Sequence, residues 1–319
     1  MRLPKSIALF CVVLPLFPLV TKAQTFKFQS VGFVTPAAIN SSGAIAGSFC
    51  CSYSSGFDGP EQQTHGFSMK GMVFKIAEPR TSLGSFATGI APNGDVVGGF
   101  CPAKSGGCSS GAAIHGYLFR NSSNSALQID VPGARATLAG GINQSGQIVG
   151  MGCNTTTCSL AYPPESHGFE LDRIGGNFTT IDYPGAVGTS ATAINDAGDI
   201  VGNYLTCLSE DLESELLRLP CEFVQLHGFL LSSGIFTRID PPGSTSTYVG
   251  GINNSDEVVG SYSEAVFTGH GFLYKSGVYT IVDVPGASST GITGVNDQGE
   301  IVGGAQLKSG FENFIGIPQ

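Results

Sequence analysis

All five histidines of this 319-residue chain stand in one repeated motif, His-Gly followed by Phe or Tyr. The motif begins at His65, His115, His167, His227 and His270. A second motif, Ile or Val followed by Asp-x-Pro-Gly, comes shortly after four of them, at Asp130, Asp182, Asp240 and Asp283, and the first copy has the weaker match at Glu78. A histidine beside a carboxylate is the arrangement of a general base or of part of a catalytic triad.

Turn residues between the two motifs place each histidine opposite its aspartate. Folding the chain about Ser233-Gly234 brings His227 level with Asp240, and the other copies behave alike. Residues that face each other on neighbouring strands are within reach of one another. The predicted pairs are His115–Asp130, His167–Asp182, His227–Asp240 and His270–Asp283. A catalytic group is needed once, whereas this pair recurs, so we interpret the pairs as structural hydrogen bonds and assign no catalytic residue.

The elements that would position these pairs come from an internal repeat of about 50 residues. A third motif, close to Gly-Ile-Asn-x-x-Gly-x-Ile-Val-Gly, occurs in every copy. Its Asn position holds Asn40, Ala91, Asn143, Asn195, Asn253 and Asn296. Each copy contains four short apolar runs separated by hairpin signals such as Asn-x-x-Gly and Ser-Gly. We therefore interpret the asparagines as turn residues.

Four antiparallel strands in each of six copies predict an all-β fold, a six-bladed β-propeller of four-stranded antiparallel blades. A β-helix is the alternative, but its parallel coils would not show hairpin turns. The last copy has room for three strands, so we expect an N-terminal strand at 26–31 to close the last blade and remove the free edges. The predicted blades are 33–79, 85–132, 137–184, 189–242, 246–285 and 289–317 plus 26–31.

With these repeats the chain resembles the HAF-repeat extracellular proteins of bacteria. The shared elements are the Gly-Ile-Asn-x-x-Gly-x-Ile-Val-Gly motif, as in 141–150, and the His-Gly-Phe motif, as in 167–169. The resemblance covers nearly all of residues 26–317. It implies a bacterial exported protein and brings no catalytic residues with it.

Residues 1–23 have the pattern of a signal peptide. Arg2 and Lys5 precede an apolar run over 7–20, and Thr21-Lys22-Ala23 fits a small-x-small cleavage site. The run is too short for a membrane-spanning helix and no second run of spanning length follows, so no transmembrane anchor is predicted. We expect residues 24–319 to form a single domain that is secreted or periplasmic.

Charge and motif content exclude several classes of ligand. The formal net charge is −9, and loss of the three basic residues of the leader would make it −12, so nucleic acid is not expected as a partner. The turns at 195–199 and 296–300 lack the alternating acidic ligands of a calcium loop. A Gly-x-Ser-x-Gly match at 107–111 lies in a cysteine loop rather than between a strand and a helix. No metal or cofactor is expected.

Eight cysteines follow the leader, an even number that favours disulfides in an exported protein. Each falls between the second and third strands of a predicted blade. Three pairs share a loop, and the fourth pair would be a vicinal disulfide; bridges between adjacent blades are the alternative. The predicted pairs are Cys101–Cys108, Cys153–Cys158, Cys207–Cys221 and Cys50–Cys51.

The face that carries these loops is the predicted ligand face, because function concentrates on variable loops over a rigid scaffold. Its candidate contact residues are the aromatics Tyr53, Phe57, Phe100, Tyr162, Tyr204, Tyr248 and Tyr262. The expected channel lining is small and aliphatic, with Tyr248 as the exception, and offers no acid or base. We therefore predict a non-catalytic binding or scaffolding protein for a carbohydrate, a peptide or a small molecule. The alternatives are a hydrolase or lyase that uses Glu61, Glu165 or Glu264, and a purely structural surface protein.

Overall fold

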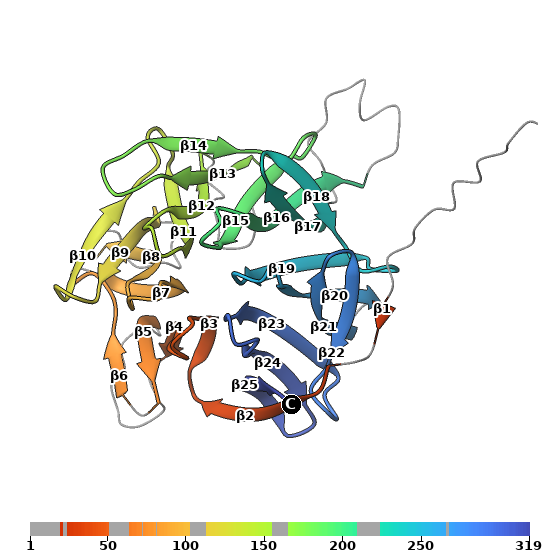
Figure 1. Cartoon of the computed structure of the whole chain (residues 1–319). Coiled ribbons are helices and arrows are strands. Elements are labelled where there is room, and N and C mark those ends of the chain that lie inside the picture. Colours follow the sequence, from red (N-terminus) through yellow and green to blue (C-terminus); the bar gives the residue numbers. More distant parts are fainter. Residues whose placement is uncertain are drawn as a thin grey trace, which may run out of the picture.

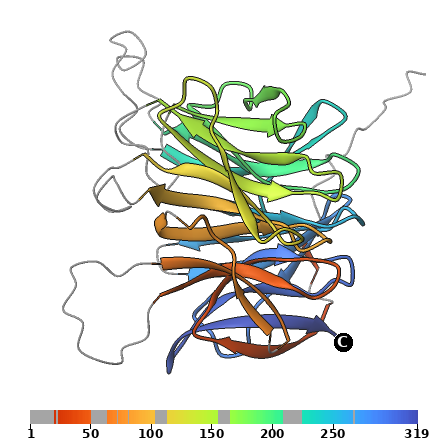
Figure 2. The same ribbon diagram turned by 90° about the vertical axis from the view of Figure 1, so that its left-hand side faces the viewer.

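The computed structural model describes residues 20–21, 24–50, 64–71, 73–80, 82–102, 113–154, 165–208, 224–265 and 268–319. Every regular element among these residues is a β-strand. The strands form sheets arranged in a ring around a central axis (Figure 1). A side view shows the strands of each sheet crossing the thickness of the ring (Figure 2). The chain is an all-β protein with a β-propeller architecture, as the repeat predicts.

Four separate sheets have four antiparallel strands each. The first two are β3 (Thr35–Ile39), β4 (Ile45–Cys50), β5 (Thr64–Lys70) and β6 (Val73–Ile76), then β7 (Ser82–Ile90), β8 (Val96–Pro102), β9 (His115–Arg120) and β10 (Ser125–Ile129). The next two are β11 (Ala136–Ile142), β12 (Ile148–Cys153), β13 (Ser166–Leu171) and β14 (Phe178–Ile181), then β15 (Gly188–Ile194), β16 (Ile200–Cys207), β17 (Val224–Ser232) and β18 (Ile235–Ile239).

The remaining strands form one nine-stranded sheet, where the sequence predicts two more separate blades. Its strands are β19 (Ser246–Ile252), β20 (Val258–Ala265), β21 (Thr268–Lys275), β22 (Val278–Val282), β23 (Ser289–Val295), β24 (Ile301–Leu307), β25 (Gly310–Pro318), β2 (Phe26–Gly32) and β1 (Val20–Thr21). A single parallel pairing, Gly269 with Ser289, joins the run β19–β22 to the run β23–β25 and β2. The strand β1 adds to β22 in parallel.

The N-terminal strand closes the ring, as expected from residues 26–31. β2 pairs antiparallel with β25, with Phe26 opposite Pro318 and Gln29 opposite Ile315. The rings of Phe28 and Phe314 meet edge to face at 5.0 Å across this pairing. Strands from the two ends of the chain therefore share one sheet.

The glycine that ends the third motif is required by close packing within each sheet. A Cβ atom at Gly150 would lie 2.1 Å from the carbonyl oxygen of Leu138 on the inner strand, and one at Gly202 would lie 2.1 Å from that of Ser190. The same contact recurs in every copy, at Gly47, Gly98, Gly150, Gly202, Gly260 and Gly303. A residue with a Cβ atom does not fit so close to a carbonyl oxygen. The glycine of the motif is therefore required by the close approach of two backbones.

The inner strands β3, β7, β11, β15, β19 and β23 each carry a β-bulge at the same place. The extra residue alternates around the ring between a small residue and threonine, in the order Ala37, Thr88, Gly140, Thr192, Gly250 and Thr293. The hydroxyl of each threonine donates to a carbonyl of the next inner strand, as Thr88 does to Ala139 O at 2.6 Å. A Cβ at Gly140 would lie 2.5 Å from Ala191 O, so the next strand leaves no room for a side chain there.

The aromatic residues of the His-Gly-aromatic motif fill the space between neighbouring sheets. Each is buried to 0 or 2% exposure, and the set comprises Phe67, Tyr117, Phe169, Phe229 and Phe272. Burial of large apolar side chains is the main favourable contribution to such a fold. The core therefore lies between neighbouring sheets, and each sheet packs against the sheet on either side of it.

One face of the ring, here the turn face, consists of the turns at 40–44, 91–95, 143–147, 195–199, 253–257 and 296–300. The asparagine that starts five of these turns donates from Nδ2 to the backbone oxygen of the residue that starts the next turn. Thus Asn40 bonds to Ala91 O at 2.9 Å, and Asn296 closes the ring on Asn40 O at 3.1 Å. Ala91 interrupts this asparagine ring because it has no donor. The asparagines are turn residues, as predicted, and also join neighbouring sheets.

Candidate functional site

The opposite face, here the loop face, carries the histidines. All four predicted pairs are present. The Nδ1 atom lies 2.7 Å from the Asp130 carboxylate in His115, 3.0 Å from Asp182 in His167, 2.7 Å from Asp240 in His227 and 2.8 Å from Asp283 in His270. His65 makes a fifth pair with Glu78 at 3.1 Å, in the copy with the weaker motif. Each pair joins the third strand of a sheet to the end of its fourth.

An aromatic ring of the second strand packs against four of these five histidines. Phe49 faces His65, Phe100 faces His115, Tyr204 faces His227 and Tyr262 faces His270. The ring centroids lie between 5.0 Å, for Tyr204 and His227, and 5.7 Å, for Phe100 and His115. Gly152 stands opposite His167, whose side chain is 56% exposed. The pair is thus a repeated structural unit, and what surrounds it differs between sheets.

The pair formed by His227 and Asp240 is the most buried, with side chains 6% and 10% exposed. The guanidinium of Arg238 and the backbone N–H of Gly228 also donate to Asp240. Burial alone would raise the pKa of Asp240, but the hydrogen bonds from His227 and Arg238 and their positive charge outweigh it, so the pKa lies below its ordinary value. This carboxylate is therefore ionised at neutral pH.

Three of the aromatics predicted on the ligand face are buried within their sheets instead. Phe100 is 3% exposed, and Tyr204 and Tyr262 are 4% exposed. Their side chains are held by the histidines opposite them and by the sheet core, so they are not displayed on loops. Tyr248 does line a cavity. Tyr53, Phe57 and Tyr162 lie outside the described residues.

The structure describes one cysteine of each predicted pair. Cys50, Cys153 and Cys207 end the second strands of their sheets, and Cys101 is the next-to-last residue of β8, on the loop face. Cys101 and Cys153 are buried in one apolar cluster with Ile114 and Ala136. The predicted partners Cys51, Cys108, Cys158 and Cys221 lie outside the described residues, so all four bridges stay predictions.

A cavity of about 320 Å³, here the axial cavity, lies on the ring axis within the loop-face half of the inner strands. Its apolar walls include Phe86, Leu138, Met151 and Tyr248. No acidic or basic residue is among the described residues that line it. The sequence predicts Tyr248 as the one exception to a small and aliphatic lining. Phe86 and Met151 are two more, and Met151 comes from the second strand β12 rather than an inner strand.

Towards the turn face the axis is lined by a ring of aliphatic side chains. They are buried at 5 to 8% exposure and comprise Ile39, Ile90, Ile142, Ile194, Ile252 and Val295. Two smaller cavities, of about 80 and 70 Å³, are lined by this ring.

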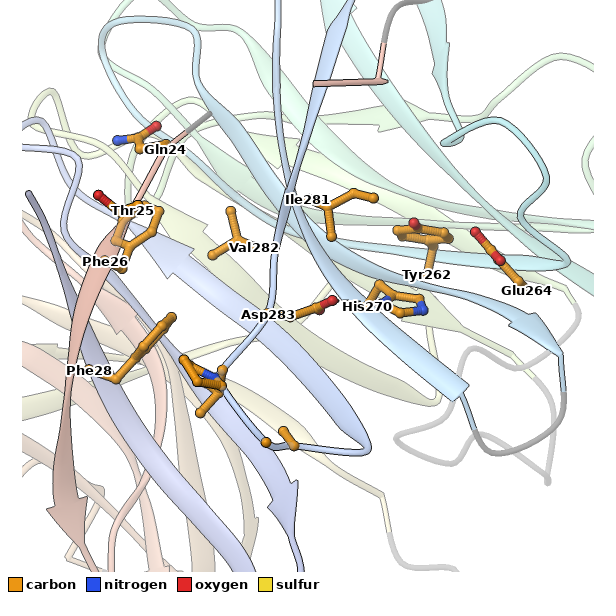
Figure 3. A pocket seen from close by; sticks show the side chains of 14 residues that line it. Gln24, Thr25, Phe26, Phe28, Tyr262, Glu264, His270, Ile281, Val282 and Asp283 are labelled. Carbon is orange, nitrogen blue, oxygen red and sulfur yellow. Dashed lines mark hydrogen bonds and ion pairs between the residues drawn. The ribbon is translucent and has the colours of Figure 1, made fainter. Parts of the chain in front are cut away.

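A larger cavity of about 720 Å³, here the flank pocket, lies between β20–β22 and the N-terminal strand β2 (Figure 3). His270, Asp283, Tyr262 and Glu264 form one wall, and Phe26 stands on the other side. Burial, together with the negative charges of Glu264 and Asp283 and a hydrogen bond to Glu264, raises the pKa of Tyr262 to about 12. Tyr262 is thus protonated at neutral pH and cannot serve as a base.

The three predicted loop carboxylates are therefore in different places. Glu264 lies on the flank pocket, whereas Glu165 is exposed beside β13 with a backbone φ of 67°. Glu61 lies outside the described residues. No cluster of three or more His, Cys, Asp or Glu side chains suited to a metal ion occurs in the part of the chain that the structure describes. The same residues include no helix that could span a membrane.

The sequence matches no protein-family model, and no curated protein matches it, so the resemblance to HAF-repeat proteins stays a prediction. Solved structures with a similar fold include the β-propeller domain of the trilobed protease from Pyrococcus furiosus, at 11% identity and a TM-score of 0.50 over 89% of this chain and 81% of that one. A mutant of AofleA from Arthrobotrys oligospora also has a TM-score of 0.50, at 9% identity over 92% and 88% of the two chains. At these identities the likeness concerns the fold alone: the chain is similar to β-propellers.

Proposed function

We propose that this chain is an exported, six-bladed binding propeller that takes a small apolar ligand, or the apolar end of a larger one, in the axial cavity. The nine-stranded sheet supports the blade number, since its two four-stranded antiparallel runs are joined by one residue pair. The predicted leader, the even number of cysteines and the HAF-like repeats support export. The axial cavity carries the proposal.

The size and the lining of the axial cavity fit a small-molecule site. Protein pockets for such ligands have volumes of roughly 300–1,000 Å³ and mainly apolar walls with few polar groups. The hydroxyl protons of Thr88, Thr192 and Thr293 are donated to backbone carbonyls, so these side chains offer no proton to a ligand. Phe86, Leu138 and Met151 supply large apolar surfaces, beside the hydroxyl groups of Thr35, Ser190 and Tyr248. An aromatic or branched aliphatic group fits this wall better than a sugar.

A hydrolase or lyase remains the second candidate, because the flank pocket brings Glu264 together with His270, Asp283 and Tyr262. Against it, the His–Asp geometry is the same in sheets where the pair is simply exposed, such as His167 and Asp182. The common geometry favours a structural role for the pair. Turnover of a chromogenic ester or glycoside that is abolished by Glu264→Gln would favour the enzyme.

The binding proposal is tested by filling the axial cavity. Ala37 lines it at the bulge of β3, so Ala37→Leu places three more carbon atoms in the cavity. Ala197→Leu is the matched control, because Ala197 is exposed in a turn of the opposite face. The neutral fluorescent probe N-phenyl-1-naphthylamine should bind the wild type and the control with one saturable site, and Ala37→Leu should weaken binding at least about tenfold. Equal binding by all three proteins, each with a cooperative thermal transition, would refute the proposal.

A further inference from the structure

The flank pocket lies at the place where the ring is closed. One wall comes from β20, β21 and β22 with the connection 283–287, and the other from Gln24, Thr25, Phe26 and Phe28 at the start of β2 (Figure 3). These segments are far apart in sequence, and the β2–β25 pairing holds β2 in position. The pocket is thus built largely from strands held in place by backbone pairing, which helps to position the groups of a selective site.

The acidic side chains of its lining have no basic Lys or Arg side chain beside them. Glu264 is exposed, and the Asp283 side chain is 39% exposed. None of the fourteen described residues that line the pocket is Lys or Arg. Asp283 keeps hydrogen bonds to His270 Nδ1 at 2.8 Å and to the Gly271 N–H at 3.3 Å, which fix its carboxylate on the wall. With His270 counted as neutral, the side chains of the lining carry two formal negative charges, and removal of the predicted leader would add one α-amino group, at Gln24.

The remaining wall is aromatic and aliphatic. The rings of Phe26 and Phe28 lie 6.1 Å apart, and Phe28 is supported edge to face by Phe314. Ile281, Val284 and Pro285 continue the apolar lining. A cation near the face of an aromatic ring is attracted by the ring quadrupole, and a nearby carboxylate adds a direct charge interaction.

From these two walls we infer that the flank pocket is a binding site for an organic cation, an ammonium or guanidinium group carried on an aromatic or short aliphatic body. The carboxylates of Glu264 and Asp283 would receive the cationic group, and Phe26 and Phe28 would pack against its body. An anion would meet repulsion from both carboxylates, and a neutral apolar molecule would leave them uncompensated. This site is separate from the axial cavity and does not depend on the function proposed for it.

Three probes of closely similar shape distinguish the contribution of charge to binding from that of apolar contact. Calorimetric titration at pH 7.5 and low salt should show binding of phenethylammonium, at least about tenfold weaker binding of 2-phenylethanol, and no detectable binding of phenylacetate. Because exposed charges are screened by salt, the affinity for phenethylammonium should fall as sodium chloride is raised. Equal affinity for the three probes would overturn the inference.

Substitutions in equivalent copies of the repeat provide matched controls. Glu264→Gln and Asp283→Asn should each weaken phenethylammonium binding about tenfold, whereas Asp182→Asn changes the same kind of pair outside the pocket and should leave binding unchanged. Glu264 is exposed, so its variant keeps the fold even where Asp283→Asn proves unstable. Loss of binding in Ala37→Leu, or retention in Glu264→Gln, would show that the cation does not bind here.

Discussion

The turn face and the loop face both carry a repeated polar side chain, but the two repeats make different contacts. On the turn face each asparagine bonds to the next inner strand, and the Nδ2–oxygen distances stay between 2.9 and 3.4 Å around the ring. On the loop face each histidine bonds within its own sheet, and its side-chain exposure ranges from 6% at His227 to 56% at His167. The histidine–carboxylate distances vary as little, from 2.7 to 3.1 Å, so the surroundings of the histidine differ between sheets while its bond stays the same.

The largest effect is expected on the turn face, from Asn296→Ala. Asn296 is 2% exposed, its Oδ1 accepts from the N–H groups of Gln298 and Glu300, and its Nδ2 donates to Asn40 O. Removing the amide leaves buried groups without partners, which should lower the free energy of unfolding by about 2–3 kcal/mol in urea denaturation. A cost below about 0.5 kcal/mol would mean that the asparagine ring does not hold the sheets together.

On the loop face the cost should depend on burial, which Asp240→Asn and Asp182→Asn compare directly. Asp240 is nearly buried and binds both His227 and Arg238, so its substitution should cost about 2 kcal/mol at pH 7. Asp182 is 47% exposed, and Asp182→Asn should stay within about 0.5 kcal/mol. Equal costs at the two positions would contradict the idea that only the surroundings differ.

The same pair of variants has a distinct pH signature. The folded state holds the pKa of Asp240 below its ordinary value of 3.8, so this group stabilises the protein above that pH. The contribution is lost as the pH falls below 3.8 and through the lower folded-state value, because the unfolded chain takes up the proton first. In Asp240→Asn the free energy of unfolding should therefore fall less steeply as the pH is lowered into the acid range. In Asp182→Asn its dependence on pH should be that of the wild type.

A smaller effect, of opposite sign, is expected from Tyr117→Phe near the loop face. The Tyr117 hydroxyl is the only buried side-chain polar atom without a hydrogen-bond partner among the described residues, and burial raises its pKa. A Cβ at Gly66 would lie 2.7 Å from this oxygen, so the hydroxyl is packed against the neighbouring sheet. Removing it should raise the melting temperature by an amount that corresponds to about 1 kcal/mol in the free energy of unfolding. A lower melting temperature would reveal a water or other partner at the hydroxyl.

The contacts that recur in every copy could be predicted from the sequence. The hairpin positions alone place His227 opposite Asp240, and the missing strand of the last copy predicts the role of residues 26–31. The burial of Phe100, Tyr204 and Tyr262 could have been predicted, because each lies two residues after the glycine that ends the third motif. A position repeated in this way belongs to the scaffold rather than to a variable loop.

The cavities could not be predicted in this way, because each is formed by side chains from several sheets. Phe86 and Met151 reach the axial cavity from β7 and β12, and no pattern within one repeat shows that they meet. The flank pocket likewise depends on where β2 enters its sheet, which sets Phe26 across from Glu264. Pairing rules decide which strands are neighbours, whereas the space left between sheets depends on side-chain volumes around the whole ring.

The pairing of β2 with β25 also sets the order of events when the protein folds. β2 is made before all the inner strands and its partner at 310–318 after them, so this contact spans every repeat of the ring. Contacts of such high sequence separation form slowly, because a long loop must close first. A chain that lacks β25 cannot seal its ring, and β2 stays without this partner until β25 has been made.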